Sequence, residues 1–485
     1  MPHEDRIGQS AWDYGTVIII VIAALAVSPG NARVYGEELL SGPVAGTGHT
    51  ILDRSTLTGD WWGVRDILFA HGVAFDVSLT QLYQGVTTGG KDRDFDYGGK
   101  LDCYVNIDGG KAGLWPGFSV TTHVETRYGN DVNEIDGMFS LANFNMAFPK
   151  GENSGSGVTA LKLTQRLFDH LLLIAGKINT LDDFRLNYTG GNGLDRFMNS
   201  AVVANVINGR TIPYSTYGAG FAVFADQGPE FTFLLRDPDN HPTTTDLNKL
   251  FAHGALLTGS LRLQVAPFGL PGTQVFGGNW SSRHYTSLDP SDWENVPGQG
   301  LPAPEESGSW AIWYNADQTL WINPANTNQW LGVFEMSGLS DGNPNSVRWN
   351  VTVGLGAGGL VHGRKHDTMG VAYFHIGVSD EVKDLLASQP RPRAARRTRS
   401  RLVLQRRAQS MVSLDRRSAS RTTEHEGLRY RRAGRHPAES RFLTQEAMEI
   451  MQKATSVTML VFVMSSSEGG SLTKLAVALY LNRDR

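Results

Sequence analysis

The sequence predicts an all-β protein, specifically a transmembrane antiparallel β-barrel. Apolar and polar residues alternate with a period of two from about Ala74 to Val378, as at Leu101, Cys103 and Val105. Side chains on a β-strand point alternately to opposite faces, so one face of each strand is apolar and the other polar. Many such segments of about ten residues, separated by turns rich in Gly, Asn and Asp, are typical of membrane-spanning barrels. A soluble β-sandwich shows the same alternation and is the structural alternative.

The composition fits one large barrel as well as it fits two or three ordinary domains. The chain has 485 residues, and its 55 glycines suit many tight turns. A single cysteine, Cys103, excludes an internal disulfide framework. The sequence contains no apolar run long enough for a transmembrane helix. A barrel is not expected to contain one, because half of each strand is polar.

The first residues predict an export signal. Residues 17–27 (VIIIVIAALAV) form an apolar run that is too short to span a bilayer and suits the core of a signal peptide. Gly30 and Ala32 are small residues at the positions that a signal peptidase reads. We therefore expect residues 1–32 to be a cleaved signal peptide, followed by a flexible segment over residues 33–56.

The elements then follow in order along the chain. The segment from Leu57 to Asp66 contains Gly-Asp-Trp-Trp-Gly and leads through a short amphipathic turn into the first strand. Strands are expected near residues 75–83, 100–108, 118–127, 161–168, 171–178, 221–225, 230–237, 255–267, 273–280, 310–315, 318–323, 330–337, 347–355 and 368–378. The longer connections, such as residues 237–249 and 286–309, are rich in Pro, Asp, Asn and Gly and are expected to be outer loops.

The alternation also assigns faces to these strands. Phe231, Phe233 and Leu235 are expected to face outward, whereas Asn350 and Thr352 are expected to face a lumen. Aromatic residues gather at strand ends, as the interfacial girdles of a barrel require: Tyr83, Trp115, Tyr128, Trp280, Trp310, Trp313, Trp321 and Trp330. Packing in the core of a sandwich is the alternative explanation for these aromatic residues.

With these features in place, the chain resembles the carbohydrate-selective porins of Gram-negative outer membranes, the OprB family. The motif Gly59, Asp60, Trp61, Trp62 and Gly63 carries the resemblance. Later segments add to it: Gly176-Lys-Ile178, Leu181-Asp-Asp183 and Val371-Ala-Tyr-Phe374. The resemblance covers about residues 57–386. It implies a sixteen-stranded barrel in contact with outer-membrane lipid, forming a homotrimer and passing glucose and related small sugars by diffusion.

A channel for an uncharged sugar needs hydrogen-bond donors and acceptors on its wall, and charged side chains in a constriction supply both. The alternation places a set of polar residues on the proposed inner faces: Lys100, Asp102, His123, Glu125, Arg127, Lys177, Asp183, Arg185 and Arg236. Glu125 and Arg127 are two residues apart on one strand and therefore project to the same side. The plainer interpretation is that each is an ordinary solvated residue of the lumen.

The sequence changes character from about Gln389. Between Arg391 and Arg441 there are 16 arginines and no lysine against 4 acidic residues, a charge of +12. The whole chain has a formal net charge of −4, which leaves −16 for the remainder. One interpretation of this basic segment is a tail that binds nucleic acid or an anionic surface.

A frameshift near Ser388 explains the basic segment better. Shifting the reading frame forward by one base between Arg393 and Ser440, with suitable synonymous codons, gives a different amino-acid sequence. In that sequence apolar and polar residues alternate as in strands, and it resembles the usual C-terminal end of the family. Residues 57–388 are therefore expected to form an incomplete barrel, with residues 389–485 as an aberrant tail in place of the closing strands. An unclosed barrel leaves backbone groups unpaired in hydrocarbon, so we expect the product as written not to assemble a working pore.

Other chemical interpretations are weaker. Passive diffusion requires no cofactor, metal ion or catalytic residue, and we expect the protein not to be an enzyme. The acidic pair Asp182-Asp183 invites a glycosidase interpretation, and the loop around Asp237 invites a calcium site, but ordinary turn chemistry explains both. The main functional alternative is a secreted, soluble, β-rich carbohydrate-binding protein, which would partition into water. With the frameshift, no nucleic-acid partner is expected.

Overall fold

The computed structural model describes the following parts of the chain: residues 61–86, 91–136, 140–150, 155–184, 186–190, 193, 196–225, 230–292, 304–362, 367–388, 456–468 and 471–480. Several expectations fall outside these residues. They are the signal peptide over residues 1–32, the segment 33–56, the motif residues Gly59 and Asp60, Arg185, and the tail over residues 389–455.

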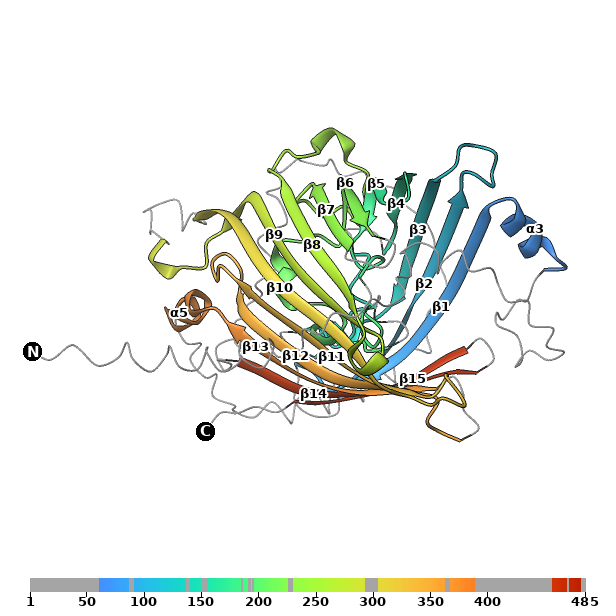
Figure 1. Cartoon of the computed structure of the whole chain (residues 1–485). Helices are drawn as coiled ribbons and strands as arrows, with labels where there is room; N and C mark the ends of the chain where they lie inside the picture. The colour runs from blue at the N-terminus through green and yellow to red at the C-terminus, as the bar shows by residue number, and fades with distance from the viewer. Residues whose placement is uncertain are drawn as a thin grey trace, which may run out of the picture.

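The described strands form a single sheet in which each strand pairs antiparallel with its neighbours in the sequence. Figure 1 shows this sheet curving around a central region. Thirteen strands cover the part of the chain in which the alternation was found: β1 (Val73–Gly85), β2 (Phe95–Asp108), β3 (Phe118–Gly129), β4 (Ser156–Leu167), β5 (Leu171–Asn179), β6 (Ser215–Phe224), β7 (Glu230–Arg236), β8 (Leu256–Val265), β9 (Gly272–Thr286), β10 (Glu305–Ile322), β11 (Trp330–Ser340), β12 (Val347–Gly358) and β13 (Thr368–Val378). The predicted all-β antiparallel architecture is confirmed.

One predicted boundary is wrong. The segments 310–315 and 318–323 were expected to be two strands, whereas the structure has one continuous strand, β10. Ala316 and Asp317 lie between the two expected strands, but they continue the alternation, because Asp317 is buried on the inner face. The pairing with β11 shifts register only after Thr319, where a bulge absorbs one residue.

The end of the chain contributes two further strands that the sequence analysis did not predict. β14 (Ser456–Glu468) pairs along β13, and β15 (Ser471–Tyr480) pairs along β14, so the sheet has 15 strands. The sequence from Met459 to Met464 is a continuous apolar run rather than an alternating one, which is a weaker strand pattern. Among the described residues, no backbone pairing joins β15 to β1.

Short helices lie at the ends of strands. α3 (Val64–Ala70) precedes β1, and α5 (Asp380–Ser388) follows β13. α4 (Ser200–Val203) and a 3₁₀ turn over Val206–Arg210 lie between β5 and β6, and further 3₁₀ turns span Val132–Glu134, Leu247–Lys249, Pro267–Gly269 and Pro290–Asp292. Within the described part of the chain, every helix is too short or too polar to cross a bilayer.

The two faces of the sheet differ as the alternation predicts. Large apolar side chains are exposed on the outer face, including Leu79, Leu161 and Val353. Polar side chains such as Asn350 and Thr352 are buried on the inner face. Water does not favour so much exposed apolar surface, whereas lipid does.

The inner face carries a packed core formed with the connection between β5 and β6. Ala201, Val202 and Ile207 from this connection pack against Phe334 and Phe374 of the sheet. Figure 1 shows the connection on the concave side of the sheet. We call the described part of residues 180–190 the inner strap, because it runs along the inside of the sheet before this core begins.

The strap packs tightly on β11. A Cβ atom added at Gly332 would lie 2.1 Å from the Tyr188 ring. We predict that Gly332→Val pushes the strap off the wall and lowers the free energy of unfolding by about 1–3 kcal/mol, the usual range for overpacking. The measurement is urea unfolding in detergent, followed by tryptophan fluorescence. The matched control is Gly259→Val, where an added Cβ meets no atom within 4 Å; equal losses in both variants would contradict the prediction.

Candidate functional site

Four of the predicted lumen residues form one buried group on the inner face of the sheet. Lys100 and Asp102 come from β2, and His123 and Glu125 come from β3. The register pairs Asp102 directly with Glu125, and residues two apart on a strand share a face. Strand alternation alone therefore brings these side chains together, and all four are almost completely buried.

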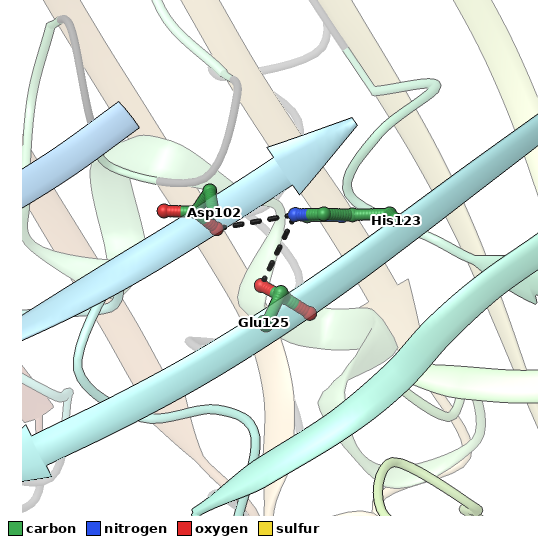
Figure 2. A group of neighbouring side chains, drawn as sticks. All are labelled: Asp102, His123 and Glu125. Carbon is green, nitrogen blue, oxygen red and sulfur yellow. Dashed lines mark hydrogen bonds and ion pairs between the residues drawn. The ribbon is translucent and has the colours of Figure 1, made fainter. Parts of the chain in front are cut away.

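The group is held by ion pairs. The Lys100 ammonium contacts the Glu125 carboxylate, and its Nζ lies 3.3 Å from Asp102 Oδ1. His123 Nε2 lies 3.1 Å from Asp102 Oδ1 and 3.7 Å from Glu125 Oε1, as Figure 2 shows. Two cationic groups and two carboxylates thus alternate within one small volume, which offsets much of the cost of burying each charge.

The inner strap is attached to this group through Asp182. His123 Nδ1 lies 3.1 Å from both Asp182 carboxylate oxygens, and Tyr104 donates a hydrogen bond of 3.0 Å to Asp182 Oδ1. The Tyr104 and His123 rings stack with centroids 3.8 Å apart. Both ring nitrogens of His123 face carboxylate oxygens, an arrangement that is fully satisfied when both nitrogens carry a proton.

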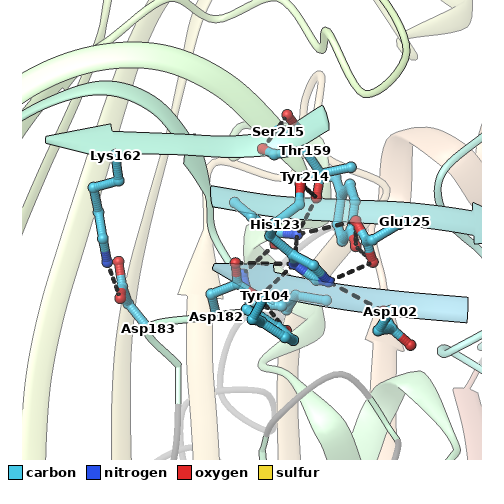
Figure 3. Close-up of polar contacts among 12 residues, drawn as sticks. Asp102, Tyr104, His123, Glu125, Thr159, Lys162, Asp182, Asp183, Tyr214 and Ser215 are labelled. Atoms are coloured by element: carbon cyan, nitrogen blue, oxygen red, sulfur yellow. Dashed lines mark hydrogen bonds and ion pairs between the residues drawn. The ribbon is translucent and has the colours of Figure 1, made fainter. Parts of the chain in front are cut away.

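Further contacts extend the network to either side (Figure 3). Tyr214, just before β6, donates to both Glu125 oxygens at 2.6 and 2.8 Å. Asn179 donates to Glu125 Oε2 at 3.3 Å. Lys162 on β4 donates to Asp183 Oδ1 of the strap at 2.5 Å. The first strap residues are therefore fixed by two neighbouring carboxylates, each bonded to a different strand.

The network also sets the charge state of the strap. Burial acts to raise the pKa of Asp182, but the hydrogen bonds and charge of His123 outweigh it and hold that pKa below its usual range. Asp182 is therefore ionised at neutral pH and remains the counter-charge that holds the strap to β3.

The far end of the strap is attached to a distant part of the same sheet. Backbone N and side-chain Nδ2 of Asn187 donate to the two Asp317 carboxylate oxygens on β10, at 2.6 and 2.7 Å. The Tyr188 hydroxyl lies 2.5 Å from Thr319 Oγ1, and its ring packs on Trp330 with centroids 4.9 Å apart. Since β3 and β10 lie seven strands apart in the curved sheet, the strap crosses the concave side from one wall to the other.

The remaining predicted site residues have other partners. Arg127 donates to Met146 O at 2.6 Å and so holds the connection between β3 and β4. Arg236 is buried on the inner face and donates to Thr180 Oγ1 at 3.0 Å, at the start of the strap. Lys177 shares its face with the exposed Leu161, and donates to the carbonyl of Thr244 in the connection between β7 and β8.

The double-tryptophan motif has a structural role at the start of β1. Trp61 packs on Phe75 with ring centroids 4.8 Å apart, and the Arg65 guanidinium donates to Phe75 O at 3.0 Å. Gly63, with φ of 86°, adopts the left-handed conformation immediately before α3. The described residues of the double-tryptophan motif therefore pack α3 against the first strand rather than lining the inner face.

Among the residues that the structure describes, two groups of side chains have the spacing of metal ligands. In the first, Asp102, His123 and Glu125, the Lys100 ammonium already supplies the positive charge. In the second, which contains Asp237, Asp239 and His241, ion pairs also account for the acidic side chains: Asp239 Oδ1 lies 3.0 Å from Arg283, and its Oδ2 lies 2.5 Å from His253. Both groups are thus explained as ion-pair networks of the protein.

Sequence reasoning missed several members of the site. Tyr104 and Lys162 could have been found, because both alternate with outward residues and therefore lie on the same face as the predicted residues. The sequence analysis named Asp182 within a segment of the family resemblance and as half of a possible catalytic pair, but not as a residue of the site. Asn187 and Tyr188 carry no signal in the sequence, since they belong to a connection whose path depends on the completed sheet.

We predict that Asp182→Asn destabilises the fold by about 3–5 kcal/mol, because His123 and the other buried charges lose their counter-charge. The wild-type pKa is depressed, so its contribution is complete above the ordinary carboxyl pKa of about 3.9 and is lost as pH falls through the folded-state value. The gap in urea unfolding between variant and wild type should be widest at neutral pH and narrow below about pH 4. Asp380→Asn is the control, because that side chain is 87% exposed; a gap independent of pH would contradict the prediction.

Comparisons with known proteins agree with this architecture. The family model described as "Carbohydrate-selective porin, OprB family" matches residues 92–400. The solved high-pH structure of Pseudomonas putida OprB superposes with a TM-score of 0.62 and 16% sequence identity, covering 87% of this chain and 96% of that one. This likeness shows a shared fold.

Further solved structures are more distant. The low-pH structure of Pseudomonas putida OprB gives a TM-score of 0.49 at 12% identity, over 88% of this chain and 93% of that one. Vibrio cholerae OmpT, an outer membrane protein, gives 0.34 at 12% identity, over 63% and 76%. No curated protein matches the chain by sequence. Since the family model covers most of the chain, this protein belongs to the carbohydrate-selective porin family, OprB, and is an outer-membrane channel protein rather than an enzyme.

Proposed function

We propose that this protein is a pore for the passive diffusion of small uncharged carbohydrates such as glucose, and that the inner strap forms its constriction. The observation that supports this most is the attachment of the strap at both ends. Asp182 bonds to His123 on β3, and Asn187 bonds to Asp317 on β10. A segment fixed to two walls of a barrel narrows the passage that remains beside it.

The chemistry of the wall suits a neutral, hydroxyl-bearing solute. Around the strap, cations and carboxylates are paired, as in Lys100 with Glu125 and Lys162 with Asp183. Paired charges offer donors and acceptors to sugar hydroxyls without a net attraction for either sign of ion. We propose Lys100, Asp102, His123, Glu125, Arg127, Asp183 and Arg236 as residues that line or shape the pore, together with Asp182 and Tyr104. Arg185, which lies outside the described residues, stays in the proposed set, whereas Lys177 is left out of it because it shares the face of the exposed Leu161.

The proposed location of this pore is the bacterial outer membrane. Export through a signal peptide cleaved after Ala32 and assembly as a homotrimer belong to the proposal. The exposed apolar side chains of the outer face, such as Leu79 and Leu161, support contact with lipid. Membership of the porin family argues against the alternative of a soluble secreted binding protein.

The altered end of the chain enters the proposal as well. We infer a reading-frame change near Ser388, because the segment from Arg391 to Arg441 has 16 arginines where a barrel needs further strands. β14 and β15 extend the sheet beyond this segment. A barrel of antiparallel neighbours closes in the ordinary way with an even number of strands, and the structure has 15. We therefore expect a working pore from the frame-restored chain and not from the chain as written.

Liposome swelling tests the function directly. Liposomes loaded with the frame-restored chain should swell in glucose, more slowly in disaccharides and least in larger oligosaccharides, because the strap limits the passage by size. The chain as written should give no swelling above that of empty liposomes, since its barrel does not close. Empty liposomes and liposomes with heat-denatured protein are the controls. Swelling rates that do not depend on the size of the sugar would contradict the proposed constriction.

A further inference from the structure

Arg236 is a buried cation that no carboxylate contacts within the described part of the chain. It is the last residue of β7 and is 2% exposed. Its guanidinium donates to two neutral hydroxyl groups, Thr180 Oγ1 at 3.0 Å and Thr258 Oγ1 at 2.6 Å. Lys100 and Lys162, by contrast, each contact a carboxylate. A positive charge that is buried without a counter-charge costs free energy, so the position of Arg236 needs an explanation.

The strap does not supply a contacting counter-charge. Asp183 acts on Arg236 through its charge, but its carboxylate is bonded to Lys162 Nζ at 2.5 Å. The Arg236 Nε–H has no hydrogen-bond partner among the described residues. A guanidinium carries five N–H groups in a planar fork that fits the two oxygens of a carboxylate. The two threonine hydroxyls use only part of this fork, so Arg236 retains donors for an anion.

The neighbouring strand makes room for the Arg236 side chain. Gly218 on β6 pairs with Arg236, and a Cβ atom added at Gly218 would lie 2.6 Å from Arg236 Cγ. A larger residue at this position would therefore displace the aliphatic part of the arginine. The guanidinium reaches the first residues of the strap at one hydroxyl and β8 at the other. The fold thus holds this charge beside the proposed constriction.

An acceptor without a donor lies on the next strand. Asn279 of β9 pairs with Thr258 and so shares its face, and Figure 1 shows β7, β8 and β9 side by side. Asn279 Nδ2 donates to Asn208 Oδ1 at 2.9 Å, whereas Asn279 Oδ1 has no partner in the described structure although the residue is 6% exposed. Thr258 therefore has an unused donor group beside it on β7 and an unused acceptor beside it on β9.

We propose that Arg236, Thr258 and Asn279 form a site for sugar acids, in which the carboxylate of the solute binds the Arg236 guanidinium and a hydroxyl of the same solute donates to Asn279 Oδ1. A simple anion would neutralise Arg236 but would leave the Asn279 acceptor unpaired. The inference rests on the proposed function and extends the substrate class of the pore from neutral sugars to hydroxylated carboxylates.

Binding at this site requires an exchange of partners. Because Arg236 is almost completely buried, the carboxylate reaches it by replacing the hydroxyl of Thr180, which belongs to the strap. An ion pair with a carboxylate is stronger than a hydrogen bond to a neutral hydroxyl, which favours this exchange. The displaced Thr180 hydroxyl keeps its own acceptor, Pro213 O at 2.8 Å.

Isothermal titration calorimetry tests the site on the full chain as written, because binding needs no closed pore. The chain is folded into detergent and titrated with sodium gluconate, a sugar acid, at constant ionic strength. Glucose, which lacks the carboxylate, and acetate, which lacks the hydroxyls, are the comparison ligands. We expect gluconate to bind at least about tenfold more tightly than either, the gain expected from one additional hydrogen bond to a charged group.

Substitutions assign the binding to these residues. Arg236→Gln should weaken gluconate binding by about tenfold or more. Arg283→Gln is the matched control, because it removes the same charge from an arginine that already has a carboxylate partner, Asp239 at 3.0 Å. Arg236→Lys keeps the charge but loses the planar fork, so its affinity should lie between those of the wild type and R236Q. Asn279→Leu should remove the preference for gluconate over acetate.

The outcomes separate this site from the function on which it rests. Equal gluconate binding by the wild type and folded R236Q, or equal losses in R236Q and R283Q, would overturn the site, as would equal binding of gluconate and acetate by the wild type. If R236Q does not fold, wild-type affinity in R236K would overturn the site instead. Liposome swelling of the frame-restored chain tests the pore separately: normal swelling without gluconate binding overturns only this inference, whereas absence of sugar passage overturns the proposed function.

Discussion

The pairing of Asp182 with His123 is the interaction on which the interior of this protein depends. It joins a connection of no regular structure to the inner wall of the sheet, at a place where two strands already hold three other charges. Without an ionised Asp182, the buried imidazole would face one carboxylate fewer, and the strap would lose its attachment to β3. The strap then continues to β10, and the core of the β5–β6 connection follows it. The position of the strap on β3 therefore depends on the ion pair between Asp182 and His123.

The same network shows why a sugar pore tolerates buried charge. The two lysines on the inner face beside the strap each have a carboxylate within contact distance: Lys100 has Glu125, and Lys162 has Asp183. Pairing keeps these groups ionised in a region of low dielectric constant and keeps the local potential small. A neutral solute can then exchange its hydrogen bonds with water for hydrogen bonds with the wall.

The sequence predicted those features of the fold and site that strand alternation encodes. A period of two fixes the face of a residue once the strand exists, so the sequence could assign Lys100, Asp102, His123 and Glu125 to the inner face. The register between β2 and β3, which the sequence did not give, brings the four side chains together. It does not distinguish a long strand from two short ones, which is why β10 was divided. Contacts between distant connections and walls, such as Asn187 with Asp317, depend on the closing of long loops and leave no local pattern. Lys177 shows a further limit, because the bend at Gly176 and the loop above it decide what its ammonium meets.

The most direct test of the account is the single-channel conductance of a strap released at both ends. Asp182→Asn with Asp317→Asn removes the carboxylate that holds the strap at each wall while changing side-chain volume little, and the frame-restored chain is the background for both proteins. The account predicts that the double variant conducts more current per channel, with larger fluctuations, than the unmodified channel, because the strap no longer holds its position across the lumen. Equal conductance in the two channels, with equal heat-modifiable migration, would show that the strap does not limit the pore.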